Sequence, residues 1–234
     1  MILTGQQIRL FRHNGFLKIP EPLPSTIVDE LKRTIMEDIR KEVEPVQRDT
    51  DGNIVRISSI LGRAPIFLEA VSHPSVLDPL TCLLGPNIEA ITNRHNHATL
   101  RTRTALRGHS DLHRDVLQWT RTIVTIIFYL EETTVENGCT LIVPGSHMVQ
   151  WSTEKLYDQE GFSEVTAQAV PVPMPAGGML AIDSTVVHGI GENHTDGTRM
   201  SMTVGYHSVD ELMDVENPKR ILVRGERKYG GNDG

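Results

Sequence analysis

The order of local patterns along the chain constrains its fold more than any other feature of the sequence. Residues 1–86 show mainly helical spacing of apolar side chains, whereas the chain from Ile88 onward shows short β-branched runs separated by turn residues. Helices that precede a run of strands are typical of an α+β chain. We therefore expect N-terminal helices that pack on the outside of an antiparallel barrel or jelly roll.

Three helical patterns are expected in the first part of the chain. Thr4 can cap a first helix that ends at Gly15. A second helix is expected after Ser25, because apolar residues recur at helical spacing up to position 39. A third helical pattern covers residues 66–84. Their apolar faces indicate that these helices cover one side of a sheet.

The expected strands are short, and turn signals separate them. Asn137-Gly138 is a strong turn signal that lies between two of them. The strands are expected at residues 15–20, 88–103 (one or two strands), 122–130, 139–143, 168–174, 179–187 and 199–208.

Length and charge limit the classes of protein to which the chain can belong. A chain of 234 residues can form one large domain, which we expect over residues 1–234. Within it, residues 1–86 supply helical support, 87–208 form the core, and 209–234 form a C-terminal tail. The net charge of −7 disfavours a nucleic acid as a partner, because no surplus of Lys and Arg can neutralise phosphates, and we expect none.

Cysteine content and apolar run length point to a protein of the cytoplasm. The two cysteines, Cys82 and Cys139, are expected to be buried, reduced thiols, although the sequence alone leaves a disulfide open. The N-terminal residues lack the pattern of a signal peptide, and no apolar stretch approaches the length of a membrane span. We therefore expect no membrane partner, and the oligomeric state stays open.

His113-Arg114-Asp115 and the later His188 carry the strongest chemical signal. Residues i and i+2 of a strand point to the same side, so His113 and Asp115 can hold one ion together. His188 closes the expected strand 179–187 and precedes Gly189, where we expect a turn at the barrel mouth. Two imidazoles and one carboxylate are the ligands of a non-heme Fe(II) site that leaves positions for O2 and a co-substrate. Three such ligands and a water also describe a catalytic zinc site.

Arg199 favours the oxygenase interpretation over zinc. Along the strand 199–208, one face carries Arg, Ser, Thr, Gly and His, and the other carries Met200, Met202, Val204 and Tyr206. In a barrel that helices cover on the outside, the polar face lines the cavity. A guanidinium there can hold a carboxylate through two parallel hydrogen bonds, and Ser201 can add a hydroxyl.

These motifs together resemble the phytanoyl-CoA hydroxylase (PhyH) family of Fe(II)- and 2-oxoglutarate-dependent oxygenases. The resemblance rests on His113-Arg-Asp115, on Glu136-Asn-Gly-Cys-Thr-Leu-Ile-Val-Pro-Gly-Ser-His147, and on Asp183-Ser-Thr-Val-Val-His188. Arg199 follows at the family's usual interval of eleven residues after His188. The resemblance covers roughly residues 5–208 and is strongest from residue 109 onward.

The resemblance implies a fold and a set of ligands. The fold is a double-stranded β-helix (jelly roll) with flanking N-terminal helices. His113, Asp115 and His188 bind Fe(II), and Arg199 binds the distal carboxylate of 2-oxoglutarate. The Pro-Gly-Ser-His147 segment is expected to shape a turn, and His147 is not expected to be a ligand.

Four more residues are candidates for contacts to the co-substrate and the substrate. Arg101 and Asn93 lie on the stretch where the family places another polar contact to 2-oxoglutarate, although each also fits a solvent-facing residue. Gln118 and Trp119 follow the metal pair closely enough to line the substrate pocket, and Trp119 also fits a core position.

The expected function is oxidation of a C–H bond in a small-molecule metabolite, with natural-product intermediates among the candidates. Fe(II), 2-oxoglutarate and O2 are the expected cofactor and co-substrates, and succinate and CO2 are released. An intact Asp115 favours hydroxylation over halogenation, while desaturation, cyclisation and epimerisation stay open. Two alternatives come from other classes: a jelly-roll metalloenzyme of cupin or zinc type, and a non-catalytic binding protein.

Overall fold

The computed structural model describes residues 2–101, 112–113, 122–149, 164, 166–209 and 219–227. Its α-helices are α1 (Gly5–Asn14), α2 (Ser25–Arg40), α3 (Pro65–Val71) and α4 (Pro74–Leu84). Its strands are β1 (Phe16–Lys18), β2 (Val46–Arg48), β3 (Ile54–Ser58), β4 (Ile88–Ile91), β5 (Asn96–Arg101), β6 (Val124–Tyr129), β7 (Thr140–Ile142), β8 (Val170–Val172), β9 (Met179–Asp183), β10 (His188–Ile190), β11 (Arg199–Ser208) and β12 (Arg220–Arg224).

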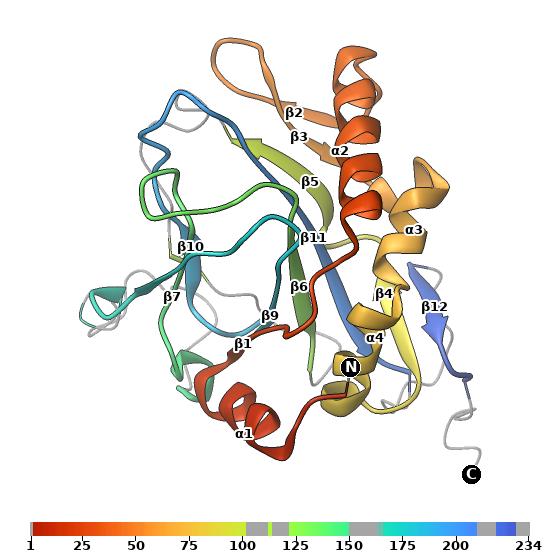
Figure 1. The fold of residues 1–234 in the computed structure, drawn as a ribbon, viewed down its shortest axis with the longest axis vertical. Coiled ribbons are helices and arrows are strands. Elements are labelled where there is room, and N and C mark those ends of the chain that lie inside the picture. The colour runs from red at the N-terminus through yellow and green to blue at the C-terminus, as the bar shows by residue number, and fades with distance from the viewer. Residues whose placement is uncertain are drawn as a thin grey trace.

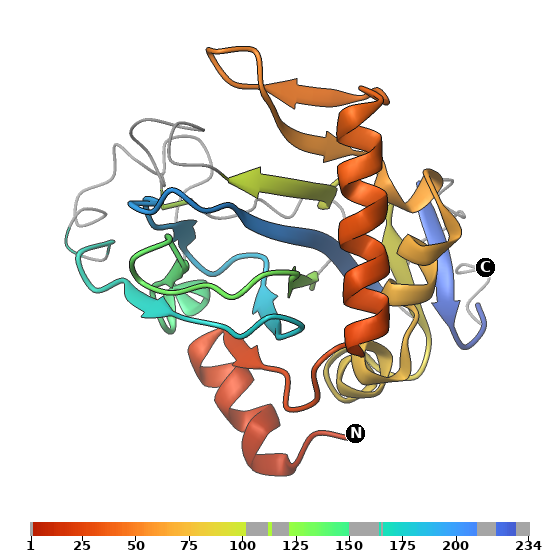
Figure 2. The same cartoon turned by 45° about the horizontal axis from the view of Figure 1, so that its top comes forward.

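Two antiparallel sheets form the core of the described chain. The large sheet has the order β1-β9-β6-β11-β5-β3-β2, and β4 joins it by pairing with both β11 and β12. The small sheet has the order β10-β7-β8. Helices α2, α3 and α4 lie along one side of the large sheet, and β7 and β10 lie on the other (Figures 1 and 2). This is an α+β chain with a jelly-roll core, as the sequence predicts.

The outer face of the large sheet and the helices bury a common hydrophobic core. Leu31 of α2, Phe67 of α3 and Leu80 of α4 are fully buried in the same cluster as Met202 and Tyr206 of β11. Removal of this apolar surface from water supplies the main driving force for placing the helices there. The polar face of β11 is therefore directed to the opposite side, between the two sheets.

The helix predictions are confirmed for α1 and α2. Thr4 caps α1 by accepting a hydrogen bond from the backbone N–H of Gln7, and Gly15 ends the helix in the left-handed region. The third pattern is wrong as one continuous helix, because α3 ends at Val71 and α4 begins at Pro74. Proline disfavours the helical conformation of the residue before it, so Pro74 starts a new helix instead of continuing the old one.

Most strand predictions are confirmed, and β11 has the predicted bounds. The prediction that His188 closes the strand that begins at Met179 is wrong. β9 ends at Asp183, whose side chain accepts hydrogen bonds from the backbone and hydroxyl of Thr185, and His188 begins β10 in the other sheet. The β2–β3 hairpin falls in the segment expected to be mainly helical, and β12 falls in the segment expected as a tail.

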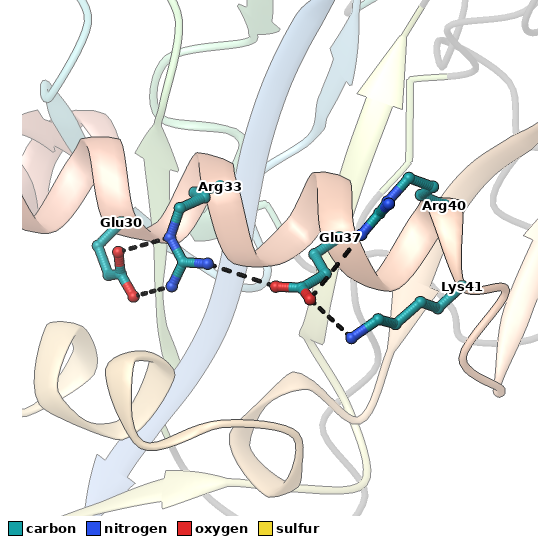
Figure 3. A network of polar contacts seen from close by, with 5 residues as sticks. All are labelled: Glu30, Arg33, Glu37, Arg40 and Lys41. Atoms are coloured by element: carbon teal, nitrogen blue, oxygen red, sulfur yellow. Dashed lines mark hydrogen bonds and ion pairs between the residues drawn. The ribbon is translucent and has the colours of Figure 1, made fainter.

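Charges on the exposed side of α2 pair with one another. Arg33 contacts Glu30 and Glu37, and Glu37 also contacts Arg40 and Lys41 (Figure 3). Such pairs keep the solvent face of an amphipathic helix polar. Among the helices that the structure describes, none is both long enough and apolar enough to cross a bilayer.

Candidate functional site

A cavity of about 310 Å³ lies between the two sheets. The large sheet contributes mainly polar side chains from β3, β5, β6 and β11, and the small sheet contributes β7 and β10. The lining includes Arg56, His95, His97, Thr99, His113, Thr125, Ile127, Thr140, Ile182, His188, Ile190, Arg199, Ser201 and Thr203. Its volume lies in the range of small-molecule sites, and its many converging polar side chains favour a polar or charged ligand.

The two expected histidine ligands meet in this cavity, although 75 positions separate them in the chain. His113 and His188 form an isolated antiparallel bridge, in which each backbone N–H donates to the other's carbonyl oxygen at 2.8 Å. Residues opposite each other in such a pair direct their side chains to the same face. The ring centroids accordingly lie 4.5 Å apart, so both imidazoles are directed toward one small volume.

A local hydrogen bond orients His188. Its Nδ1 lies 2.9 Å from the carbonyl oxygen of Val186, and a carbonyl can only accept, so Nδ1 carries the proton. The tautomer leaves Nε2 as the nitrogen whose lone pair can coordinate a metal. His188 is 9% exposed and lies at the cavity wall.

Ser146, within the Pro-Gly-Ser-His147 segment, ties the end of β7 to the residues that precede His188. Its buried hydroxyl accepts from the backbone N–H of Val187 and donates to the carbonyl of Val143. His147 lies 3.0 Å from the carbonyl oxygen of Arg12 at the end of α1, outside the set of cavity-lining residues. The segment therefore shapes a turn that supports His188.

Arg199 lines the same cavity and is 1% exposed. Its Nη1 donates to the carbonyl oxygen of Gly138, while its buried Nε has no hydrogen-bond partner. Gly138 has φ of +82°, and a Cβ there would overlap the carbonyl oxygen of Gly191, so the turn requires glycine. No carboxylate of the described residues forms an ion pair with this guanidinium.

Burial without a carboxylate destabilises the charge on Arg199. Burial lowers the pKa of Arg199, and the nearby Tyr129 and Cys139 only partly offset this effect. Burial also raises the pKa of Tyr129 to about 12, and its hydroxyl lies 2.6 Å from that of Thr140. Among the described residues, the groups that contact or approach this cation, including the Gly138 carbonyl and the Tyr129 hydroxyl, are neutral, an arrangement that an anionic ligand would stabilise.

The remaining expected residues fall into three groups. Ser201 follows Arg199 on the cavity face of β11 and is 5% exposed. Arg101 is in register with Arg199 across β5 and β11, but its side chain is not described, and Asn93 is exposed in the turn between β4 and β5. Asp115, Gln118 and Trp119 lie outside the described residues. The described residues hold no group of three His, Cys, Asp or Glu side chains suited to a metal.

Several cavity residues were not expected from the sequence. Arg56 on β3 and His97 and Thr99 on β5 share the lining with Arg199. His97 and Thr99 alternate with Ala98 and Leu100, a period-two pattern that signals a polar face. Arg56 lies between the apolar Val55 and Ile57, which gives the same signal over only three residues.

A jelly roll with two histidines and a buried arginine around one internal cavity is typical of jelly-roll metalloenzymes, a class that includes dioxygenases. The family model for phytanoyl-CoA dioxygenase (PhyH) matches residues 11–201, and the chain belongs to this family. Human peroxisomal phytanoyl-CoA dioxygenase is 24% identical over 268 aligned positions, which cover 98% of this chain and 78% of the human protein.

Solved structures of similar fold agree with this assignment. The epimerase SnoN from nogalamycin biosynthesis, described as non-heme and alpha-ketoglutarate-dependent, superimposes with a TM-score of 0.76 at 18% identity. That alignment covers 96% of this chain and 97% of SnoN. EctD from S. alaskensis with bound Fe gives a TM-score of 0.75 at 18% identity, covering 96% of this chain and 87% of EctD. At such identities the likeness establishes a shared fold.

Proposed function

We propose that this member of the PhyH family is an Fe(II)- and 2-oxoglutarate-dependent dioxygenase that hydroxylates a C–H bond of a small-molecule metabolite. His113, Asp115 and His188 would hold the metal, and Arg199 with Ser201 would hold the distal carboxylate of 2-oxoglutarate. When bound, Fe(II) and 2-oxoglutarate activate O2 for C–H oxidation, with release of succinate and CO2.

One observation carries the proposal: a buried arginine without a carboxylate partner among the described residues lines the same cavity as two converging histidines. Neutral imidazole nitrogens suit Fe(II), and Val186 presets the tautomer that presents Nε2 of His188. The unsatisfied Nε of Arg199 is a donor that a carboxylate can accept. The chain therefore offers complementary groups for both a ferrous ion and an anionic co-substrate.

The protein's own residues bind, orient and shield. The backbone bridge between His113 and His188 holds the two residues side by side, so as metal ligands they would lose little conformational entropy on binding. Arg199 would set the direction of 2-oxoglutarate, because its guanidinium can engage a carboxylate through two parallel bonds. The buried apolar side chains of Ile127 and Ile182 line the cavity and limit water near the reacting centre.

Hydroxylation is the proposed outcome in place of halogenation, because Asp115 would itself supply a carboxylate ligand where a halide would otherwise bind. Desaturation, cyclisation and epimerisation belong to the same chemistry and remain alternatives, as does a cupin- or zinc-type reaction. The expected location stays the cytoplasm, and the second contact to 2-oxoglutarate, for which Arg101 and Asn93 are candidates, stays a prediction.

The test is anaerobic titration of the purified protein with Fe(II) and then with 2-oxoglutarate. We expect one equivalent of iron and a visible charge-transfer band when 2-oxoglutarate chelates it. H113A, D115A and H188A should lose stoichiometric iron. Arg199→Gln should retain iron and bind 2-oxoglutarate weakly.

His194→Ala is the matched control, because His194 is an exposed histidine that does not line the cavity. It should behave like the wild type in both titrations. Absence of the charge-transfer band in the wild type, together with no formation of succinate, would rule out the proposed function. Zinc uptake with full activity in Arg199→Gln would favour the metalloenzyme alternative.

A further inference from the structure

The C-terminal end of helix α1 lies beside the Pro-Gly-Ser-His segment that follows β7 and is bonded to it (Figure 1). The last carbonyl groups of an α-helix have no partner within the helix, so they require other donors. The carbonyl oxygen of Arg12 lies 3.0 Å from Nε2 of His147, and because a carbonyl can only accept, this nitrogen donates. The carbonyl oxygen of Asn14 accepts from the backbone N–H of Gly145 at 2.9 Å. This end of the helix is therefore held in one position relative to β7.

Gly15 ends α1 and brings it against the turn that precedes His188. Its carbonyl oxygen accepts from the backbone N–H of Asp183, the last residue of β9, at 2.8 Å. A Cβ added at Gly15 would lie 2.6 Å from Nδ1 of His147 and 2.9 Å from a methyl carbon of Val186. Both distances are shorter than a carbon atom tolerates, and φ of +80° also favours glycine. Because Gly15 has no side chain, His147 and Val186 can contact the same residue of α1.

Residues 184–187 connect β9 to β10 and are held from two sides. On one side, Gly15 contacts the side chain of Val186, which is fully buried. On the other, the hydroxyl of Ser146 accepts from the backbone N–H of Val187 at 2.7 Å. The carbonyl group of Val186 and the N–H of Val187 belong to one planar peptide group, so holding one directs the other. Val186 lies outside the strands, and these contacts therefore set the direction of its carbonyl group.

The direction of this carbonyl group bears on the metal site, because its oxygen lies 2.9 Å from Nδ1 of His188. Either ring nitrogen of a neutral imidazole can carry the proton, and the hydrogen bond that one nitrogen makes decides which does. If the carbonyl of Val186 is displaced, the proton is free to move to Nε2 and to occupy the lone pair that coordinates a metal. The end of α1 can therefore act on His188 through Val186, although none of the cavity-lining residues that the structure describes belongs to α1.

We infer that His147 and Gly15 are positioning residues for His188, because they hold the end of α1 against Val186 and so keep its carbonyl group directed at Nδ1 of His188. The inference rests on the proposed function, since it takes His188 to be a metal ligand. His147 lies outside the cavity lining and acts through its hydrogen bond to Arg12 and its contact with Gly15. A change at either positioning residue should therefore alter metal affinity while every residue of the cavity lining stays the same.

The first measurement uses the metal-free protein, labelled with nitrogen-15 and kept in mildly alkaline buffer so that its histidines are neutral. Proton–nitrogen correlation spectra show which ring nitrogen of His188 carries the proton, and His188→Ala identifies its signals by their loss. We expect the proton on Nδ1 in the wild type, and on Nε2 in at least half of the molecules of His147→Ala. His147→Gln keeps a donor for the carbonyl of Arg12 and should restore the wild-type tautomer.

The second measurement is the affinity for Ni(II), which takes the place of Fe(II) without redox chemistry, by titration calorimetry. His147→Ala and Gly15→Ala should each bind Ni(II) at least fivefold more weakly than the wild type, because groups that orient a ligand contribute to metal affinity. Gly52→Ala is the matched control for Gly15→Ala, since Gly52 has φ of +86° but an added Cβ there would meet no atom within 4 Å. His13→Ala, in an exposed position of α1, is the control for His147→Ala. Both controls should bind Ni(II) as the wild type does.

Three results would overturn the inference while the proposed function stands. These are a proton on Nε2 of His188 in the wild type, an unchanged tautomer in the folded variants of His147 and Gly15, and an equal loss of Ni(II) affinity in Gly52→Ala and Gly15→Ala. Lower stability of His147→Ala with an unchanged tautomer would thus make His147 a structural residue only. Gly15→Ala serves if His147→Ala does not fold. Failure of the wild type to bind Ni(II) would remove the proposed function, whereas the tautomer of His188 in the metal-free protein would still show whether the end of α1 orients it.

Discussion

The two ends of strand β11 bury basic side chains in opposite ways. At one end, Arg199 is 1% exposed and has a backbone carbonyl as its partner, with no carboxylate among the described residues. Near the other end, His207 is equally buried, but its Nε2 lies 2.9 Å from the carboxylate of Glu89. Arg220 and Arg227 approach the same carboxylate at 3.6 and 2.7 Å.

The difference separates a structural cluster from a ligand site on one strand. Around Glu89 the protein supplies a carboxylate that contacts His207, Arg220 and Arg227, so part of the charge of this cluster is compensated without any ligand. Around Arg199 the compensation is missing within the described residues, and the cavity gives access to a molecule that can supply it. Burial alone therefore does not mark a functional arginine, whereas burial without a counter-charge beside a cavity does.

Glu89→Gln should give the largest effect on stability. It removes the anion from a buried cluster of three basic side chains, and breaking a buried pair in this way costs about 3–5 kcal/mol. Urea denaturation should show this loss in the free energy of unfolding, while the folded variant binds 2-oxoglutarate within twofold of the wild type. A variant as stable as the wild type would show that the cluster is not structural.

Arg199→Gln should weaken ligand binding and leave the stability of the fold intact, the opposite of what we expect for Glu89→Gln. Loss of a buried charge-assisted contact to the co-substrate should weaken 2-oxoglutarate binding by about 3 kcal/mol, roughly a hundredfold or more. The free energy of unfolding should stay the same or rise, because an uncompensated buried cation is removed. Calorimetric titration and urea denaturation of one preparation measure both quantities. A large loss of stability with unchanged binding would make the two ends of β11 alike.

Acid should weaken the Glu89 cluster selectively. Burial opposes the charged form of Glu89, but hydrogen bonds from His207 and Arg227 outweigh it, so its pKa lies below the ordinary value of 4.5. A lowered pKa means that the stabilisation is fully present above pH 4.5 and is lost as the pH falls through the pKa of the folded state. The difference in unfolding free energy between wild type and Glu89→Gln should therefore shrink below pH 4.5. A difference that is constant down to the acid transition would contradict this origin.

The same strand shows what the sequence can predict and what it cannot. The bounds and faces of β11 follow from ten residues of unbroken alternation between polar and apolar side chains, a local signal. The start of β10 at His188 depends on a tight turn at Asp183 and on pairing with β7, and this pairing is not encoded in the local pattern. The assignment of residues 1–234 to one domain stays a prediction.

The residues of the candidate site also divide into those that a local pattern predicts and those that it does not. Arg199 and Ser201 are predicted by alternation and by the interval after His188, and the structure places both in the cavity. Arg56 and His97 come from strands whose approach to β11 is set by sheet order, so no local pattern connects them with the motifs. Asp115 lies outside the described residues, so its place beside the histidines stays a prediction.

Substitution of Glu131 tests whether its contacts position the start of β11, where Arg199 lies. Its carboxylate accepts hydrogen bonds from the backbone of Met200 and the hydroxyl of Thr198, the two neighbours of Arg199, and it pairs with Lys32 of α2. Glu131→Ala should lower the free energy of unfolding by about 1–2 kcal/mol and raise the Kd for 2-oxoglutarate several-fold. Glu132→Ala, in the adjacent exposed position, is the control. Weaker binding without any loss of iron uptake would identify Glu131 as a positioning residue for Arg199.

Glu37→Gln should give the smallest change in the free energy of unfolding. It serves as an exposed counterpart to the buried carboxylate of Glu89. Glu37 also collects several cations, namely Arg33, Arg40 and Lys41, but on the solvent side of α2 (Figure 3). Water and salt screen exposed pairs, so the attraction gained on folding is small. Urea denaturation should give a free energy of unfolding within error of the wild type, at low and at high salt. A loss comparable to that of Glu89→Gln would mean that the number of cations around a carboxylate, and not its burial, decides how much the cluster stabilises the fold.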